Sequence, residues 1–165
     1  MNLRKTRTRR RTLTLQRKNR RYRCTDKHTD NTDFFEIKKK MEYLFEKETE
    51  TIIGIQYDVF NALCWGLREK HYERAIMEEA RVKNIPCLSQ VRKKVMYKGR
   101  LIGYNYADLL FYGKILVELK VGNALIKRDF DQLNEYLKEN NIQIGLLVLF
   151  SPTGVVIRRL ANIKK

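Results

Sequence analysis

The stretch YADLLFYGKILVELK, residues 106–120, places two acidic residues and a lysine within apolar, strand-like sequence. Asp108 lies in its first half, Glu118 and Lys120 lie in its second, and a Tyr-Gly turn separates the halves. Acidic residues are depleted in strands, so their presence here needs a reason. Residues two apart on a strand share a face, so Glu118 and Lys120 point together, and a meander brings Asp108 alongside from the neighbouring strand. The stretch therefore predicts that two carboxylates and one ammonium group converge.

Such a cluster suits the hydrolysis of a phosphodiester bond. Carboxylate oxygens hold Mg²⁺ or Mn²⁺, the metal stabilises charge on the phosphate and lowers the pKa of a bound water, and a lysine orients or polarises that water. In this hypothesis Asp108 and Glu118 bind the metal and Lys120 assists the water. The alternative is an edge strand on which the acids face solvent and pair with Lys120 or Lys114 as ordinary surface charges.

The sequence on either side of this stretch predicts an α/β fold. The expected order is helix, helix, three strands in a meander, helix, strand, strand, and the crossover through the last helix puts a parallel pair into the sheet. We therefore expect a mixed central sheet of about four to five strands flanked by helices. Helical spacing covers residues 36–63, 69–83 and 127–140, and strand patterns cover residues 88–97, 101–111, 115–120, 142–150 and 155–160.

Positive charge is concentrated near the N-terminal end of the chain. The formal net charge is +16, and residues 1–23 hold eleven Lys or Arg and no acid, which leaves 24 basic and 19 acidic residues elsewhere. We expect a basic, disordered tail over residues 1–33 and a single domain over residues 34–165. Such a tail binds phosphates by releasing counterions. The candidate nucleic-acid contacts are Arg4, Arg9, Arg10, Arg11, Arg20 and Arg21.

Charge alone does not choose a partner for the tail. An anionic lipid surface would attract it by the same electrostatics. Its Arg and Thr content without acids also fits an organellar targeting segment or a solvated, solubilising tail. We favour nucleic acid and leave these alternatives open.

The cysteines and histidines are too few and too scattered to hold a metal. Cys24, Cys64 and Cys87 form no CxxC pair, and His28 and His71 lie far apart in the sequence. This spacing argues against a zinc ribbon, an iron–sulfur site and a disulfide framework. We interpret Cys64 and Cys87 as reduced core thiols.

Hydropathy gives no support for membrane insertion or secretion. The sequence has no run of about 18 apolar residues and no hydrophobic segment of the signal-peptide kind near its N-terminus. We therefore expect a soluble, intracellular protein that does not bind membranes.

Two further motifs flank the central stretch. Residues 66–72, GLREKHY, fit the signature GxxExxY, and residues 132–136, QLNEY, fit QxxxY. With Asp108 and the ExK element at residues 118–120 between them, the chain resembles the GxxExxY protein family over roughly residues 50–162. That family is a branch of the PD-(D/E)XK superfamily, similar to RecB-type and Cas4-type nucleases. The resemblance implies a restriction-endonuclease-like core.

The resemblance also implies roles for individual residues at the metal. Asp108 and Glu118 would be the principal metal ligands, and Lys120 would be the catalytic lysine. Glu69 would be the early acidic residue of the site, contacting the metal directly or through water. A simpler interpretation of Glu69 is an acid in the first turn of a helix, where the helix dipole favours it.

Two residues of the following helix would line the same site. By the resemblance, Gln132 and Tyr136 would contact the substrate phosphate or support the metal ligands. Packing in the core is an equally simple interpretation of Tyr136 and of Tyr72 in the GxxExxY motif.

These observations favour a Mg²⁺- or Mn²⁺-dependent deoxyribonuclease, with DNA preferred over RNA by resemblance. One alternative is a nucleic-acid-binding module that keeps the nuclease fold but is inactive alone or needs a partner protein. Another is an interaction protein whose tail binds acidic partners or membranes. A homodimer, and the choice between endonuclease and exonuclease, are left open.

Overall fold

The computed structural model describes residues 36, 39 and 44–162. These residues belong to one compact unit that spans residues 31–165. The predicted tail over residues 1–33, its candidate arginines and the expected domain boundary lie outside the described residues. They stay predictions.

Five strands form a single mixed sheet in the order β1-β2-β3-β4-β5. The pairs β1–β2, β2–β3 and β4–β5 are antiparallel, and β3–β4 is parallel. The predicted mixed sheet with one parallel crossover is thereby confirmed. The strands are β1 (Cys87–Tyr97), β2 (Arg100–Phe111), β3 (Ile115–Val121), β4 (Ile144–Ser151) and β5 (Gly154–Ala161).

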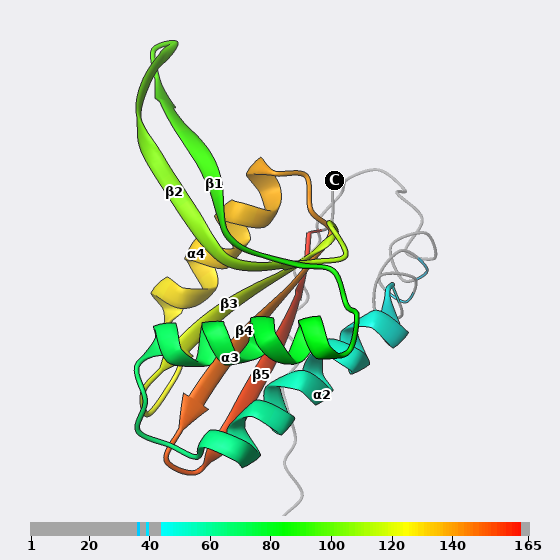
Figure 1. The fold of residues 1–165 in the computed structure, drawn as a ribbon. Helices are drawn as coiled ribbons and strands as arrows, with labels where there is room; N and C mark the ends of the chain where they lie inside the picture. Colours follow the sequence, from blue (N-terminus) through cyan, green and yellow to red (C-terminus); the bar gives the residue numbers. More distant parts are fainter. Residues whose placement is uncertain (1–35, 37–38, 40–43, 163–165) are drawn as a thin grey trace, which may run out of the picture. The chain divides into compact units, whose positions relative to one another are not determined.

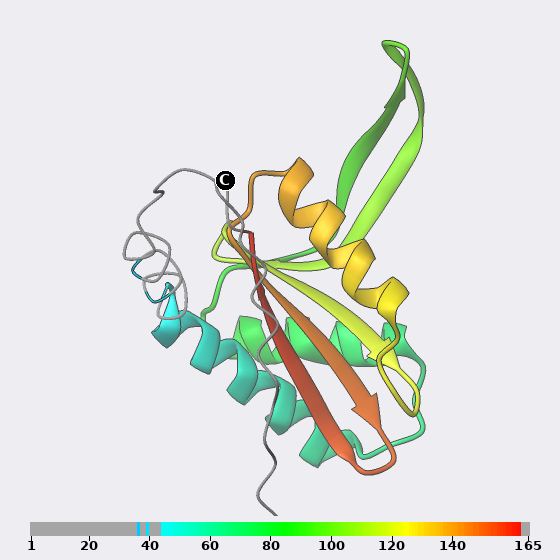
Figure 2. The same cartoon turned by 180° about the vertical axis from the view of Figure 1, so that it is seen from behind.

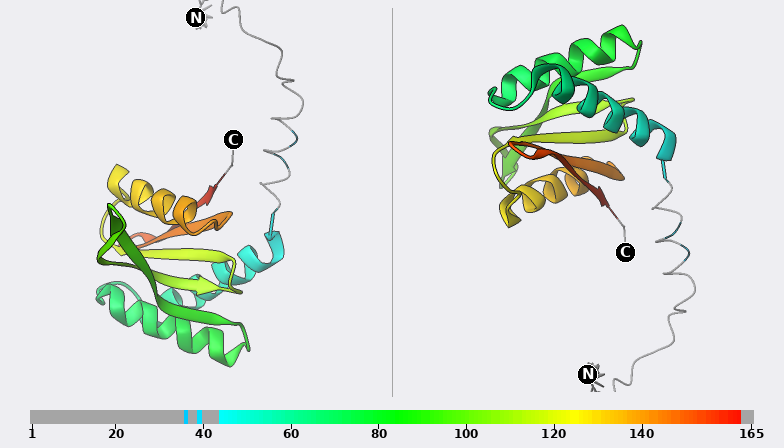
Figure 3. Two further views of the ribbon diagram at one scale, coloured as in Figure 1. Left: turned by 90° about the horizontal axis from the view of Figure 1, so that it is seen from above. Right: turned by 90° about the horizontal axis from the view of Figure 1, so that it is seen from below.

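Helices cover both faces of the sheet, as Figures 1 and 3 show. Helices α2 (Glu46–Leu63) and α3 (Glu69–Val82) pack on one face, and α4 (Lys127–Glu139), which connects β3 to β4, packs on the other. Every residue of β4 is buried between these layers, which explains its continuous apolar sequence. No helix in the described residues is long and apolar enough to cross a membrane.

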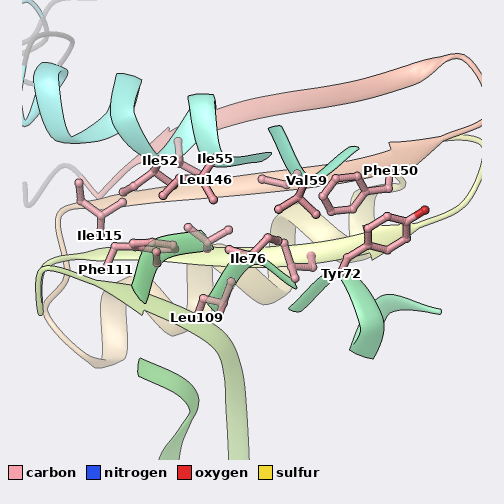
Figure 4. Close-up of a cluster of buried hydrophobic side chains, with 14 of the residues drawn as sticks. Ile52, Ile55, Val59, Tyr72, Ile76, Leu109, Phe111, Ile115, Leu146 and Phe150 are labelled. Carbon is pink, nitrogen blue, oxygen red and sulfur yellow. The ribbon is translucent and has the colours of Figure 1, made fainter. Parts of the chain in front are cut away.

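The larger part of the core lies between the sheet and the α2–α3 layer (Figure 4). Tyr72 is fully buried there, and its ring stacks on that of Phe150 with 4.2 Å between centroids. Its hydroxyl donates a hydrogen bond of 2.6 Å to the carbonyl of Cys64. The packing interpretation of the tyrosine in the GxxExxY motif is therefore correct.

A smaller apolar cluster lies under α4, where helix and sheet approach closely. Leu133 and Leu137 of α4 are buried against the sheet. A Cβ added to Gly145 of β4 would lie 3.0 Å from Leu133 Cδ1 and 3.1 Å from Leu137 Cδ1. A larger residue at position 145 would therefore crowd these two leucines of α4.

The β1–β2 hairpin extends beyond the helices that cover the rest of the sheet (Figures 1 and 2). Its strands pair in register from Cys87↔Phe111 to Tyr97↔Arg100, with a register shift between Val95 and Met96. The outer half of the hairpin consequently has large exposed side chains.

The interpretation of Cys64 as a core thiol is wrong. Cys64 is exposed, because α2 ends at Leu63 and the chain turns there with a left-handed φ of 57°. Cys87 is half-buried at the start of β1, where burial, and secondarily the charge of Glu73, raises the pKa of its thiol to about 12.

Candidate active site

Two central strands bring Asp108 and Glu118 together. The antiparallel register pairs Leu109 of β2 with Val117 of β3, so Asp108, one residue before Leu109, lies near Glu118, one residue after Val117. Asp108 Oδ2 also accepts a hydrogen bond of 2.7 Å from the backbone N–H of Leu119. This bond holds the aspartate of β2 against the backbone of β3.

Glu118 is the best-held carboxylate of the pair. Glu118 is only 3% exposed. Its Oε1 accepts hydrogen bonds of 2.6 Å from Lys120 Nζ and of 2.6 Å from Gln132 Nε2. Gln132 reaches this oxygen from α4, on the face of the sheet where that helix packs closely. The alternative of solvated charges on an edge strand is therefore wrong, since β3 is a central strand and Glu118 is buried.

Burial makes negative charge costly at this site. Burial, and then the charge of Asp108, raises the pKa of Glu118 to about 7. The pKa of Asp108 is also raised by burial, against the opposing effect of its backbone hydrogen bond. Burial alone would lower the pKa of Lys120, but its hydrogen bond to Glu118 and that residue's charge raise the pKa overall. Lys120 is therefore a cation, and one lysine faces more than one carboxylate.

Glu69 approaches the same cluster from the first turn of α3. Burial, and then the charge of Asp108, raises the pKa of Glu69, and the charge of Glu69 in turn raises the pKa of Glu118. The residue also occupies a first-turn position that the helix dipole favours, and its contact with a metal stays a prediction.

Tyr136 ties α4 to the base of the hairpin. Its hydroxyl donates a hydrogen bond to the carbonyl of Val91 and accepts one of 3.0 Å from the N–H of Ala107. The side chain is buried, and burial raises the pKa of its hydroxyl. This placement favours the supporting role over contact with substrate, because the hydroxyl is already bound to backbone groups of β1 and of β2, the strand that carries Asp108.

A second buried carboxylate, Glu73, was missed by the sequence reasoning. It lies one helical turn after Glu69, is 3% exposed, and accepts hydrogen bonds of 2.9 Å from Lys70 Nζ and of 3.0 Å from Gln90 Nε2. Its charge raises the pKa of Asp108. A signal was present, since Glu73 stands within the apolar stripe of its helix where an acid is not expected.

Gln90 shows that β1 is locally strained beside this group. Its backbone φ is +52°, which residues other than glycine rarely adopt. Such backbone strain costs on the order of 1–3 kcal/mol. The hydrogen bond from Gln90 to Glu73 is one contact that holds this conformation.

The carboxylate pair fits a hard divalent cation. Within residues 36, 39 and 44–162, no three His, Cys, Asp or Glu side chains are arranged to hold a metal ion. Mg²⁺ commonly takes one or two carboxylates and completes its shell with water and substrate phosphate. Asp108 and Glu118 meet that requirement, and of the two contacts expected for Glu69 the one through water suits this arrangement.

An open cleft of about 570 Å³ lies beside the cluster. It separates the base of the hairpin from α4 and includes Gln132, the partner of Glu118. The cleft gives a substrate access to this side of the site. Its lining residues are Tyr104, Asn105, Tyr106, Arg128, Asp131, Gln132, Glu135, Tyr136 and Glu139.

A mixed sheet that carries two acids and a lysine on adjacent central strands defines a nuclease-type core. Residues 46–160 match the family model of the PD-(D/E)XK nuclease superfamily, and the chain belongs to that superfamily. The resemblance seen in the motifs is confirmed at this level, and the GxxExxY branch stays a prediction. A solved structure titled "Crystal structure of SSO0001" is 16% identical with a TM-score of 0.46, covering 84% of this chain and 81% of that chain. No curated protein matches the chain.

Proposed function

We propose that this protein is a deoxyribonuclease that hydrolyses phosphodiester bonds with a Mg²⁺ or Mn²⁺ ion held by Asp108 and Glu118. The observation that supports it best is the pair of carboxylates on β2 and β3, the half-buried Asp108 and the buried Glu118, with Lys120 beside it. Charges buried in this way are costly without a compensating cation. Membership of a nuclease superfamily supplies the reaction class.

The hydrogen bonds around Glu118 suggest how the site is oriented. Lys120 and Gln132 both donate to Oε1, which leaves Oε2 for a metal ion. Asp108 is oriented by the N–H of Leu119 and would hold the same ion. When bound, the metal would stabilise charge on the phosphate and lower the pKa of a water ligand.

Lys120 acts as a donor in this proposal. Because its pKa is raised, the ammonium group stays protonated at neutral pH and is not a general base. It can orient the attacking water and stabilise negative charge on the phosphate. In this proposal Glu69 would contact the metal through water, and Tyr136 holds the strand that carries Asp108.

The preference for DNA follows from the family resemblance. The basic residues Arg4, Arg9, Arg10, Arg11, Arg20 and Arg21 would add affinity that does not depend on sequence. In this proposal the protein acts inside the cell.

Cleavage of labelled linear and circular DNA with Mg²⁺, Mn²⁺ or EDTA tests the proposal. We expect metal-dependent cleavage that Glu118→Gln abolishes and that Lys120→Ala slows by about a hundredfold or more. Glu78→Gln is the matched control, because Glu78 is an exposed α3 acid paired with Arg81, and it should cut at the wild-type rate. The circular substrate shows whether a DNA end is required.

Two results would contradict this assignment. Cleavage that survives Glu118→Gln would place the chemistry elsewhere. Tight, salt-sensitive DNA binding without any cleavage would favour the binding module that needs a partner protein.

A further inference from the structure

The outer part of the β1–β2 hairpin, residues 91–107, is called the arm below. It pairs only with itself along this length and extends beyond the helices (Figures 1 and 2). Six of its large hydrophobic or aromatic side chains are exposed, so they contribute little to the core. They are Met96, Tyr97, Leu101, Ile102, Tyr104 and Tyr106.

The arm is strongly cationic. It contains five basic residues and no acidic one. Among the described residues only Lys93 of these five forms an ion pair, with Glu139 of α4. The other four carry charge that the described part of the chain does not neutralise. They are Arg92, Lys94, Lys98 and Arg100.

One face of the arm combines cations with aromatic rings. The register pairs Arg92 with Tyr106 and Lys94 with Tyr104, so these four side chains share a face. The guanidinium of Arg92 lies 4.4 Å from the centre of the Tyr104 ring. Lys93, whose side chain reaches α4, belongs to the opposite face because strand side chains alternate.

The arm begins at the candidate active site. Tyr106 precedes Asp108 by two residues on β2, and residues 104–106 line the same cleft as Gln132. The hydroxyl of Tyr136 binds backbone groups of Val91 and Ala107, which are the two ends of the arm. A strand of substrate that lies along the arm would therefore reach the end of β2 that carries Asp108.

We propose that the arm binds a single-stranded segment of the nucleic-acid substrate and leads it into the active site. Tyr104 and Tyr106 would stack on unpaired bases, and Arg92 and Lys94 would contact the phosphates between them. Rings interleaved with cations are the usual chemistry of single-strand binding. The claim that the bound strand leads into the active site rests on the proposed function, whereas the claim that the arm binds single strands does not.

Charge argues against a second copy of this chain as the occupant. Two arms packed together would bring like charges close without an acidic partner, which is unfavourable. Nucleic acid supplies both a complementary charge and flat apolar surfaces.

The experiment is fluorescence anisotropy of the full-length protein in EDTA, with a labelled single strand and a duplex of the same sequence. Arg92→Glu should weaken single-strand binding by about tenfold and reduce the slope of log affinity against log salt. Arg158→Glu is the matched control, because Arg158 is an exposed arginine on β5, the opposite edge strand, and carries the same charge change. We expect it to change binding by less than about twofold.

A second pair of variants tests stacking. Tyr104→Leu should weaken single-strand binding by about fivefold or more, whereas Tyr104→Phe should keep it. Tyr57→Leu, at an exposed tyrosine of α2, is the control. Duplex binding should change less than single-strand binding in Tyr104→Leu.

Three outcomes would overturn the inference. The first is that Arg92→Glu and Arg158→Glu weaken single-strand binding equally, and the second is that Tyr104→Leu weakens single-strand and duplex binding equally. The third is that the protein is a dimer that Ile102→Ser dissociates without any change in nucleic-acid binding. Failure of the proposed function looks different. Arm-dependent binding without cleavage would contradict only the nuclease, and metal-dependent cleavage with arm-independent binding would contradict only the arm.

Discussion

Strand β3 and the arm both carry charged residues on β-structure, but their surroundings give these charges opposite consequences. Glu118 of β3 is buried, has two hydrogen-bonded partners, and has a pKa raised to about 7. Arg92 and Lys94 of the arm are exposed and have no ion-pair partner within the described residues. The pKa of a buried charged group depends strongly on its neighbours, which suits a catalytic site, whereas exposed positive charges attract a polyanion from solution.

The largest expected effect is on the buried side of this comparison. Asp108→Ala should abolish cleavage and weaken Mn²⁺ binding while the protein stays folded, because the side chain contributes a carboxylate and no core packing. Calorimetry with Mn²⁺ and circular dichroism measure the two properties. Asp58→Ala, at an exposed acid of α2 paired with Lys83, is the control. Cleavage that persists in Asp108→Ala would overturn the site assignment.

Apolar residues should show the same contrast in stability. Phe150 of β4 is fully buried against Tyr72, so Phe150→Ala should lower the free energy of unfolding by about 3–5 kcal/mol. Ile102→Ala in the arm should change it by less than about 0.5 kcal/mol, because that side chain is 64% exposed. Urea denaturation of both variants checks this. A large loss in Ile102→Ala would mean that the arm packs against something.

Deletion of residues 1–23 sharpens the comparison between the arm and the basic N-terminal residues. Removing eleven cations should weaken DNA binding and flatten its salt dependence for single strand and duplex alike. Anisotropy titrations at several salt concentrations measure this. A loss confined to single strands would contradict a purely electrostatic contribution.

The smallest expected effect is the pH dependence of the metal-free protein. Because the pKa of folded Glu118 is raised from 4.5 to about 7, the folded state binds more protons than the unfolded state in this window. The glutamate's contribution to stability therefore falls as pH rises through the window. Mn²⁺, which needs the deprotonated carboxylate, should raise the melting temperature more at pH 8 than at pH 5.5. In Glu118→Gln both dependences should become smaller, and thermal scans would show it.

Much of the fold followed from local pattern. The sequence predicted the bounds of β4, α3 and α4 within a few residues of the observed ones. It also predicted the order of helices and strands along the chain. The proximity of Asp108 to Glu118 also followed, because consecutive strands of a meander lie side by side.

Other parts of the site depended on packing between distant segments. Gln132 of α4 reaches Glu118 of β3 because the helix packs on that face of the sheet, and the spacing of QxxxY does not show this contact. Tyr136 binds the backbone of Val91, 45 residues away in the sequence. Cys64 proved to be exposed because α2 ends one residue before it.

The sequence by itself determined the class of fold, the acidic pair with its lysine, and the concentration of positive charge near the N-terminal end. These properties are local, because periodicity, residue type and spacing express them directly. Only the tertiary structure decided that Glu73 joins the electrostatics of Asp108, that Glu118 is buried enough to hold its raised pKa, and that the hairpin extends past its helices. These depend on burial and on contacts between segments far apart in the chain, and local patterns do not contain that information.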